Sequence, residues 1–336
     1  MPGSQSHHFS RRQLLARSSA LSAGAFAGLA APAWAQTSKI KPLAPKLRIV
    51  IPAAVRSNLD DASRSLGDAL LGVGYCDEVD YENHDGKGGT QALAVYNEKY
   101  AGDVNSFFMA DTSLVGALAL HKSPLTLARL APLARVTSDY LVVVVAANSP
   151  VKTLKDLTGL LRASPQQTPL AISTVGGVDH VLASLLIKAA GSKPEDGAYP
   201  AFARRHELVD AVLGGKVAAG ISSRFTFAPD LVGGKLRALG VSTKRAAYGI
   251  PSLREQGADV DITNWRAVFT GANVAAPRQA EMLEAVKKAV NYEQWKSALK
   301  QNFWEPSLLV GPDLAGFIDI DTKAMQLLAQ LLKLKV

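Results

Sequence analysis

One stretch near the start of the chain, residues 47–71 with the sequence LRIVIPAAVRSNLDDASRSLGDALL, limits the possible folds more than any other. Residues 47–51 are mostly apolar, which is typical of a strand buried on both faces, and Pro52 ends the strand because proline has no N–H to donate. From Leu59 onward apolar residues recur at helical spacing, and Ser57 or Asn58 can cap a helix there. The stretch therefore predicts a strand, a loop and a helix, the repeating unit of α/β proteins.

The loop of this unit is a candidate anion site. In α/β proteins ligands bind at the carboxyl ends of strands, and the helix that follows directs unpaired N–H groups and a positive dipole end toward the loop. The candidate binding residues in this loop are Ala53, Ala54, Arg56, Ser57 and Asn58.

Residues 1–35 have the pattern of an export signal. Arg11 and Arg12 precede two leucines and a run of small apolar residues, and Ala33-Trp34-Ala35 has the A-x-A form of a signal-peptidase site. The paired arginines resemble a twin-arginine export signal. A membrane anchor is the alternative, but the run is short and broken by Ser and Gly, whereas a spanning helix needs about 20 apolar residues. We expect a cleaved signal and a periplasmic mature protein.

Composition narrows the choice of partners. The formal net charge is +8, and the signal carries three arginines and no acid, so the mature part keeps +5. This charge is modest and no basic run is interleaved with aromatics, so we expect no nucleic-acid partner. Cys76 is the only cysteine, which excludes an intramolecular disulfide and a cysteine-based metal cluster. We expect neither a metal nor a cofactor.

Two further units of the same kind follow. A strand from Val79 leads into a glycine-rich turn over residues 84–90, but neither GxGxxG nor GxxxxGK[ST] is present, which argues against nucleotide binding. A strand over residues 104–109 then precedes a polar loop. Its residues Asp111, Thr112 and Ser113 are candidates to cap the next helix, to bind a ligand, or to do both.

These segments resemble a known family. Pro52, Asp60 and Arg64, followed by ENHDGKGG at residues 82–89, are similar to the first two motifs of the tripartite tricarboxylate transporter substrate-binding receptors, the Bug-type extracytoplasmic solute-binding proteins. Those receptors commonly read P-F-x-x-G-G-x-x-D-x-x-A-R and then E-N-x-P-G-x-G-G. Here Arg56 and Ser57 stand in place of the Gly-Gly pair, and Asp85 stands in place of the proline.

The resemblance continues through the middle of the chain. LAISTVGGVDH at residues 170–180 resembles the family's a-s-x-G-x-G-S/T-x-x-H and begins another strand, loop and helix unit. Two such helix starts facing each other would clamp an anion. The candidate binding residues here are Ser173, Thr174, Gly176, Gly177 and His180. For His180, capping, packing or a local hydrogen bond is the simpler interpretation, because a protonated histidine opposes the helix dipole.

The later segments resemble the family as well, at residues 234–242, 250–257 and 264–269. Ser222 and Ser223 would end a strand near the ligand cleft and complete the candidate binding residues. Ala219 stands where the family usually carries an Asp, which disfavours amine-bearing ligands.

The resemblance implies an α/β fold of the two-lobed periplasmic-binding-protein kind, with a mainly parallel sheet flanked by helices in each lobe and two crossovers. The expected divisions are a signal peptide at residues 1–35, lobe one at residues 46–138 plus 263–336, and lobe two at residues 139–262. We expect a monomer, with the C-terminal leucines packed in the core rather than in a dimer interface.

The resemblance also implies a function. Receptors of this family bind a small carboxylated metabolite between the lobes, hold it largely with main-chain N–H groups, and present it to the subunits of a membrane transporter without chemical conversion. Arg56 would then either grip a carboxylate or face solvent. The alternatives are a ligand-sensing orphan protein, a structural protein, or a periplasmic enzyme on the same fold, although neither G-x-S-x-G nor HExxH is present.

Overall fold

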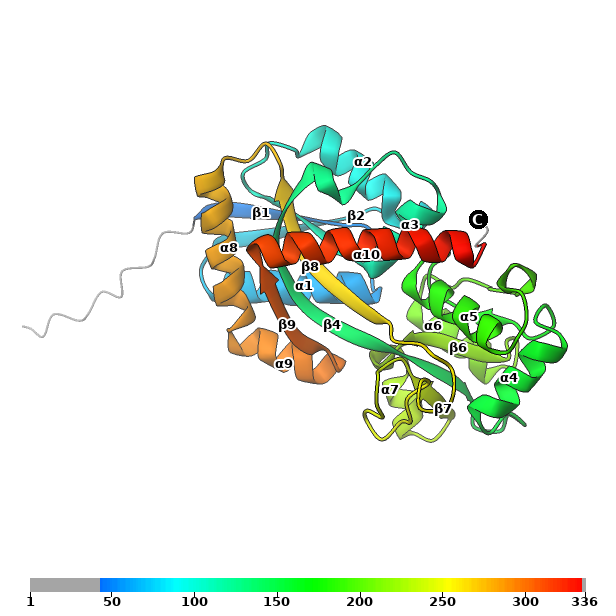
Figure 1. Ribbon diagram of the computed structural model, residues 1–336. Coiled ribbons are helices and arrows are strands. Elements are labelled where there is room, and N and C mark those ends of the chain that lie inside the picture. The colour runs from blue at the N-terminus through cyan, green and yellow to red at the C-terminus, as the bar shows by residue number, and fades with distance from the viewer. Residues whose placement is uncertain (1–42, 334–336) are drawn as a thin grey trace, which may run out of the picture. The chain divides into compact units, whose positions relative to one another are not determined.

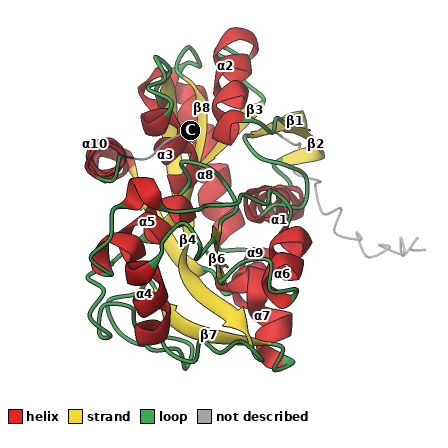
Figure 2. Ribbon diagram, turned by 90° about the vertical axis from the view of Figure 1, so that its right-hand side faces the viewer, coloured by secondary structure: helices red, strands yellow, loops and turns green. Residues whose placement is uncertain are grey.

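The strands form one curled, nine-stranded sheet, which Figures 1 and 2 show from two sides. This computed structural model describes residues 43–333. The signal peptide expected at residues 1–35 lies outside the described residues. The strands are β1 (Ala44–Ile51), β2 (Cys76–Asn83), β3 (Ser106–Asp111), β4 (Leu130–Ala146), β5 (Leu170–Ala171), β6 (Ala219–Ser223), β7 (Leu236–Val241), β8 (Thr263–Gly271) and β9 (Glu305–Val310). Their order is β2-β1-β3-β8-β4-β6-β5, and β7 and β9 also pair with β4.

Helices cover both faces of the sheet (Figure 2). The α-helices are α1 (Asn58–Gly72), α2 (Thr90–Lys99), α3 (Thr112–Leu120), α4 (Leu154–Ala163), α5 (Val178–Ala189), α6 (Arg205–Leu213), α7 (Arg224–Val232), α8 (Ala276–Val290), α9 (Glu293–Asn302) and α10 (Gly311–Leu331). Three short 3-10 helices are η1 (Lys87–Gly89), η2 (Leu127–Arg129) and η3 (Pro194–Asp196). None of the helices within residues 43–333 combines the length and the apolar character that a membrane crossing requires.

The first strand, loop and helix unit forms as the sequence predicts. In β1 the side chains of Leu47, Ile49 and Ile51 are fully buried. Helix α1 begins after Ser57, whose side-chain oxygen accepts a hydrogen bond from the Asp60 N–H at 3.2 Å. This serine therefore caps the helix, as its position before the apolar repeat indicated.

The sheet is mixed rather than mainly parallel. The pairs β1–β2, β1–β3 and β5–β6 are parallel, whereas β3–β8 and every pair that includes β4 are antiparallel. Strands that are joined through a helix run in the same direction, so the expected parallel arrangement is present among β1, β2 and β3. The expected parallel arrangement is wrong at the centre of the sheet. There β4 carries the chain from one portion of the sheet to the other and β8 carries it back, so the two strands run in opposite directions.

The 17-residue strand β4 takes part in two portions of the sheet. Its residues 130–140 pair with β8, and its residues 141–146 pair with β6 and β7. We call the part with β1, β2, β3, β8 and β9 the first portion, and the part with β5, β6 and β7 the second portion. Where β4 changes partners, the buried hydroxyl of Ser242 accepts from the Leu141 N–H at 3.0 Å and donates to the Ile262 carbonyl at 2.7 Å.

Each portion has apolar clusters on both faces. On the first portion one cluster joins α1, α8 and α9 to β1, and the other joins α2, α3 and α10 to β3 and β8. On the second portion one cluster holds α4 and α5, and the other holds α6 and α7. This arrangement matches the expected two lobes, and the lobe boundaries at residues 138/139 and 262/263 remain a prediction.

Candidate functional site

A cavity of about 410 Å³ lies where loops of the two sheet portions meet. The first portion contributes the loop after β1, the turn at residues 85–89 and the start of α3. The second portion contributes the loop after β5, the start of α6 and the junction of β6 with α7. Most of these segments follow strands, which is the usual place for a ligand in an α/β protein.

Several helix N-termini meet at this cavity. The cap residues of α1, α3 and α7, which are Ser57, Asp111 and Ser223, line it together with Val178, the first residue of α5. Within residues 43–333 the N-cap residues of α5 and α7 make no side-chain cap bond, but in α5 the Val178 N–H donates to Ser113 Oγ at 3.4 Å and the His180 N–H donates to Asp179 Oδ1 at 3.0 Å. Helix N-termini carry partial positive charge and unpaired N–H donors, so the cavity suits an anion.

Most residues singled out from the sequence reach this cavity. The candidates that line it are Ala53, Ala54, Ser57, Asn58, Asp111, Ser113, Ser173, Thr174, Ser222 and Ser223. Their role as ligand contacts stays a prediction. Five others do not line the cavity, and in each case the surrounding contacts explain why.

Arg56 lies outside the cavity. Its backbone has a φ of +65°, and its N–H donates to Asp60 Oδ2 at 2.8 Å, which turns the exposed side chain toward a neighbouring groove between α6 and α7. A left-handed backbone favours glycine, which explains why the family commonly has glycine at this position. Thr112 also lies outside, because its hydroxyl donates to the Thr263 carbonyl at 3.2 Å and accepts from the Trp265 N–H at 3.0 Å.

The remaining three, Gly176, Gly177 and His180, are turned away from the cavity. Gly176 has a φ of +82°, and a Cβ there would lie 2.9 Å from a methyl carbon of Leu120, so this loop presses against α3. The Gly176 N–H donates to His180 Nδ1 at 3.0 Å. Burial lowers the pKa of His180 to about 4. His180 therefore has the local, neutral role that the sequence favoured.

The structure adds cavity residues that the sequence analysis did not select. They include Lys87 in the glycine-rich turn, Arg205 at the start of α6, Thr226 in the first turn of α7 and Asn264 in β8. The glycine-rich turn was a signal for Lys87, and the spacing of Thr226 from Ser222 was a weak signal for Thr226. Nothing in the local sequence marked Arg205 or Asn264, because the tertiary fold alone brings them to the cavity.

Two buried carboxyl groups stand in the wall. Burial raises the pKa of Asp111 to about 6, although its hydrogen bond from the Leu114 N–H, at 2.9 Å, lowers it. Burial likewise raises the pKa of Asp179 to about 6, against hydrogen bonds from the N–H groups of Ser173 and His180. Both carboxylates accept from the backbone of their own loops, so they hold loop geometry rather than project a free charge into the cavity.

The two basic side chains that line the cavity, Arg205 and Lys87, differ in whether they form an ion pair. Arg205 forms an ion pair with Asp61 of α1 and stacks over the ring of Phe225, with its guanidinium carbon 4.2 Å from the ring centre. Burial raises the pKa of Asp61, and Arg205 lowers it. Lys87, which is exposed, forms no ion pair within residues 43–333.

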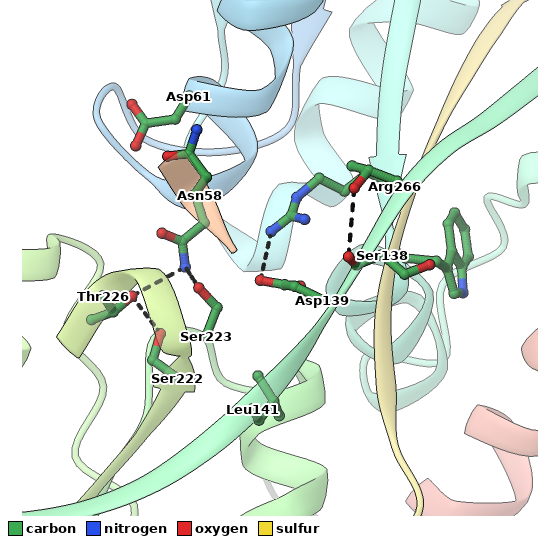
Figure 3. A network of polar contacts seen from close by, with 12 residues as sticks. Asn58, Asp61, Ser138, Asp139, Leu141, Ser222, Ser223, Thr226 and Arg266 are labelled. Carbon is green, nitrogen blue, oxygen red and sulfur yellow. Dashed lines mark hydrogen bonds and ion pairs between the residues drawn. The ribbon is translucent and has the colours of Figure 1, made fainter. Parts of the chain in front are cut away.

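A network of hydroxyl and amide groups crosses the cavity (Figure 3). Asn58 Nδ2 donates to Ser223 Oγ at 3.2 Å and to Thr226 Oγ1 at 3.3 Å, which joins α1 to the start of α7. Ser222 Oγ lies 3.0 Å from Thr226 Oγ1 and 3.4 Å from Ser173 Oγ. These contacts fix the positions of the side chains that face the cavity.

A buried ion pair lies beside the network. Arg266 Nη2 of β8 donates to Asp139 Oδ2 of β4 at 3.3 Å, and both side chains are almost fully buried (Figure 3). The guanidinium carbon of Arg266 also lies 5.1 Å from the centre of the Trp304 ring. In the β3–β8 ladder Arg266 is the partner of Asp111, so its positive charge stands close to the cavity wall.

The site has the chemistry of binding. Its polar groups are hydroxyls, amides, helix N-termini, the carboxylates of Asp111 and Asp179 that accept from backbone N–H groups, and the side chains of Asp85, Lys87, His121 and Arg205. Nowhere within residues 43–333 do three or more His, Cys, Asp or Glu side chains gather in a way that could hold a metal ion.

Comparison with solved structures shows the fold, which resembles that of periplasmic binding proteins. The periplasmic binding protein BugD is 17% identical with a TM-score of 0.76, and the match covers 86% of this chain and 98% of BugD. MatC from Rhodopseudomonas palustris, determined with bound malate, is 18% identical with a TM-score of 0.74 over 85% of this chain and 99% of MatC. A second R. palustris protein, determined with adipate, is 16% identical with a TM-score of 0.75, and the match covers 86% of this chain and 98% of that protein.

The family follows from the sequence itself. A family model described as the tripartite tricarboxylate transporter family receptor matches residues 79–333, which is well over half of the chain. The chain therefore belongs to this receptor family, as its motifs suggested. A comparison with curated proteins gave no match.

Proposed function

We propose that this protein is a periplasmic receptor that captures a small carboxylated metabolite in the cavity between the two sheet portions and presents it to the subunits of a tripartite tricarboxylate membrane transporter. The observation that carries the proposal is the meeting of several helix N-termini at one cavity of about 410 Å³. A volume of this size lies within the range of small-molecule sites.

The residues around the cavity support an anionic ligand. Helix α7 offers first-turn N–H groups that have no side-chain acceptor among the described residues, and Lys87 is an exposed cation in the wall. Main-chain donors hold a carboxylate without a charged partner, provided that the backbone is fixed. The contacts of Gly176 with α3 and the hydrogen bonds within the loop at residues 173–180 give that rigidity.

The same proposal includes the location and the mode of action. The mature protein is periplasmic, a monomer, and exported through the twin-arginine-type signal of residues 1–35. It acts without converting its ligand, because the family is one of receptors. Movement of the two lobes relative to each other would report the bound ligand to the transporter.

The test is a binding screen of the exported, purified protein. Calorimetry and thermal unfolding are measured with mono-, di- and tricarboxylates, amino acids and neutral sugars. A ligand at a hundred times its dissociation constant stabilises the folded state by about 2.7 kcal/mol, which raises the melting temperature visibly. We expect stabilisation by some carboxylates, with the ligand recovered unchanged after release. Binding of neutral sugars alone, or chemical conversion of a carboxylate, would contradict the proposal.

A further inference from the structure

The first turn of α1 reaches across to the second portion of the sheet. Asp61 of α1 forms an ion pair with Arg205, the first residue of α6. One turn before Asp61, the Asn58 amide donates to the hydroxyls of Ser223 and Thr226 at the start of α7. Figure 3 shows the side chains of Asn58 and Asp61 on this turn. The two portions are therefore joined here by side chains, in addition to the strands that run between them.

The acid next to Asp61 is held within the first portion. Asp60 accepts hydrogen bonds from the Arg56 N–H at 2.8 Å, from Arg64 Nε at 3.0 Å and from Asn83 Nδ2 at 3.0 Å. Successive side chains of a helix point about 100° apart, so Asp60 is buried while Asp61 faces α6. Asp60 therefore fixes the loop of its own portion, and Asp61 is left to contact the second portion.

The guanidinium of Arg205 is held in place by its own portion before it meets Asp61. Its central carbon lies 4.2 Å from the centre of the ring of Phe225, which belongs to α7. A guanidinium stacked on an aromatic ring is favourably placed for its charge and has little rotamer freedom left to lose when it pairs with a carboxylate. The pair should therefore be stronger than an ion pair between two freely moving side chains.

The ion pair is solvated enough to break and form again. The side chains of Arg205 and Asp61 are 30% and 28% exposed. Burial raises the pKa of Asp61 and Arg205 lowers it, so the loss of water and the pairing of charges oppose each other. The pair of Arg266 and Asp139 differs, because its side chains are 0% and 2% exposed and separating them would leave buried charges without a partner. The pair of Asp61 and Arg205 is therefore suited to a contact that opens.

The same pair stands between two hollows of the surface. Arg205 and Thr226 line both the cavity and the neighbouring groove of about 890 Å³, and Asp61 lines the groove. Val55 and Arg56 of the first portion also line the groove, opposite residues of α6 and α7. Separating Asp61 from Arg205 would therefore connect the cavity with the groove.

We propose that the ion pair of Asp61 and Arg205 is a latch that holds the two portions at the angle seen in the structure and closes the cavity toward the groove. Strands β4 and β8 keep the portions connected when the latch opens. The inference goes beyond the proposed function, because it concerns the angle between the portions and not what the cavity binds. Its test uses no ligand, so a failed latch leaves the receptor function standing, and a failed ligand screen leaves the latch standing.

The experiment measures the separation of the two portions in the exported, purified protein. Spin labels are attached to exposed positions of α2 and α4 through Lys99→Cys and Lys155→Cys, the buried Cys76 is replaced by alanine, and pulsed electron double resonance records the distances. We expect one main separation, that of the latched protein, and one minor separation. Asp61→Asn and Arg205→Gln should each raise the ratio of the minor to the main population by about three- to fivefold, the upper range for a partly exposed ion pair.

Three further measurements assign this effect to the ion pair. The double variant should equal either single variant, because both substitutions remove the same interaction. Raising the salt concentration from about 50 mM to about 1 M should shift the wild type toward the minor separation and leave Asp61→Asn unchanged. Glu207→Gln is the matched control, because Glu207 pairs with Arg204 at the start of α6 and does not link the portions. Its distances should equal those of the wild type.

Four results would overturn the latch. They are an unchanged ratio in both single variants, a single separation in every protein, a double variant whose effect is the sum of the two single effects, and a shift of the same size in Glu207→Gln. The last result would show that the overall charge, and not the pair, sets the angle. If Asp61→Asn does not fold, Arg205→Gln and the salt dependence of the wild type provide the same test.

Discussion

Replacing the buried carboxyl of Asp111 with an amide should make the protein more stable at neutral pH. Burial raises the pKa of Asp111 to about 6 from an ordinary value of 3.8. The difference of roughly two pH units corresponds to about 3 kcal/mol, since each unit is worth about 1.4 kcal/mol. Asp111→Asn keeps the oxygen that accepts from the Leu114 N–H and caps α3, because asparagine is as good a cap as aspartate.

The sign of the effect follows from linkage. The pKa of Asp111 is higher in the folded state, so its carboxyl favours folding fully below pH 4, and this contribution is lost as the pH rises through 6. Asp111→Asn should therefore match the wild type near pH 4 and exceed it by up to about 3 kcal/mol at pH 7.5. Urea denaturation of both proteins at pH 4, 5, 6 and 7.5 measures the difference, and the exposed Asp77→Asn is the control.

Two results would refute this reasoning. If the free-energy difference between Asp111→Asn and wild type does not change with pH, burial is not raising the pKa of this carboxyl. If the variant is less stable at pH 7.5, the positive charge of Arg266, the ladder partner of Asp111 in β8, stabilises the carboxylate by more than burial costs.

Further predictions concern the loop contact, a charge in the cavity, and export. Gly116→Ala should lower the free energy of unfolding by about 1–3 kcal/mol in urea titrations, because the new Cβ would lie 2.2 Å from the Gly176 carbonyl oxygen; an unchanged midpoint would show that the loop gives way freely. Lys87→Ala should weaken the binding of a dicarboxylate by up to about fivefold in calorimetry, and that of a monocarboxylate less, because an exposed charge is worth about 0.2–1 kcal/mol; an equal loss for both would contradict a charge-specific contact. Changing Arg11 and Arg12 to lysines should leave the protein in the cytoplasm in fractionation experiments, and normal export would exclude the twin-arginine route.

The fold was predictable because its signals are local. The apolar run of β1, the cap at Ser57 and the apolar spacing of α1 all lie within one short stretch. The mixed character of the sheet was not predictable in the same way, since a strand's direction depends on where the chain travels next. The apolar run at residues 141–146 of β4 would look the same in the sequence whether its neighbours were parallel or antiparallel.

The part of the cavity lining that lies at the ends of strands was predictable from the sequence, although its role as ligand contacts stays a prediction. Ser57 and Ser113 follow strands and Ser223 ends one, which is where the general rule for α/β proteins places ligands. Asn264 reaches the cavity from a strand that returns late in the sequence, and no local pattern distinguishes it. Thr112 was a candidate on the same rule, but it does not line the cavity, because its hydroxyl bonds to residues 263 and 265, which the local sequence could not reveal.

The joint in β4 has a consequence for motion. A backbone amide paired with a carbonyl keeps its bond only within a narrow range of angles, so bending a continuous ladder breaks hydrogen bonds. At residues 141 and 262 the Ser242 hydroxyl, which rotates about its own C–O bond, adds side-chain links to the backbone bonds that Ser242 makes with the same two residues. A change of angle between the two portions would strain the bond from the Ser242 N–H to the Leu141 carbonyl, at 2.9 Å, and the bond from the Ile262 N–H to the Ser242 carbonyl, at 3.3 Å, while the hydroxyl turns. The joint therefore resists bending through its backbone bonds, and it keeps the Leu141 N–H and the Ile262 carbonyl paired through a side chain.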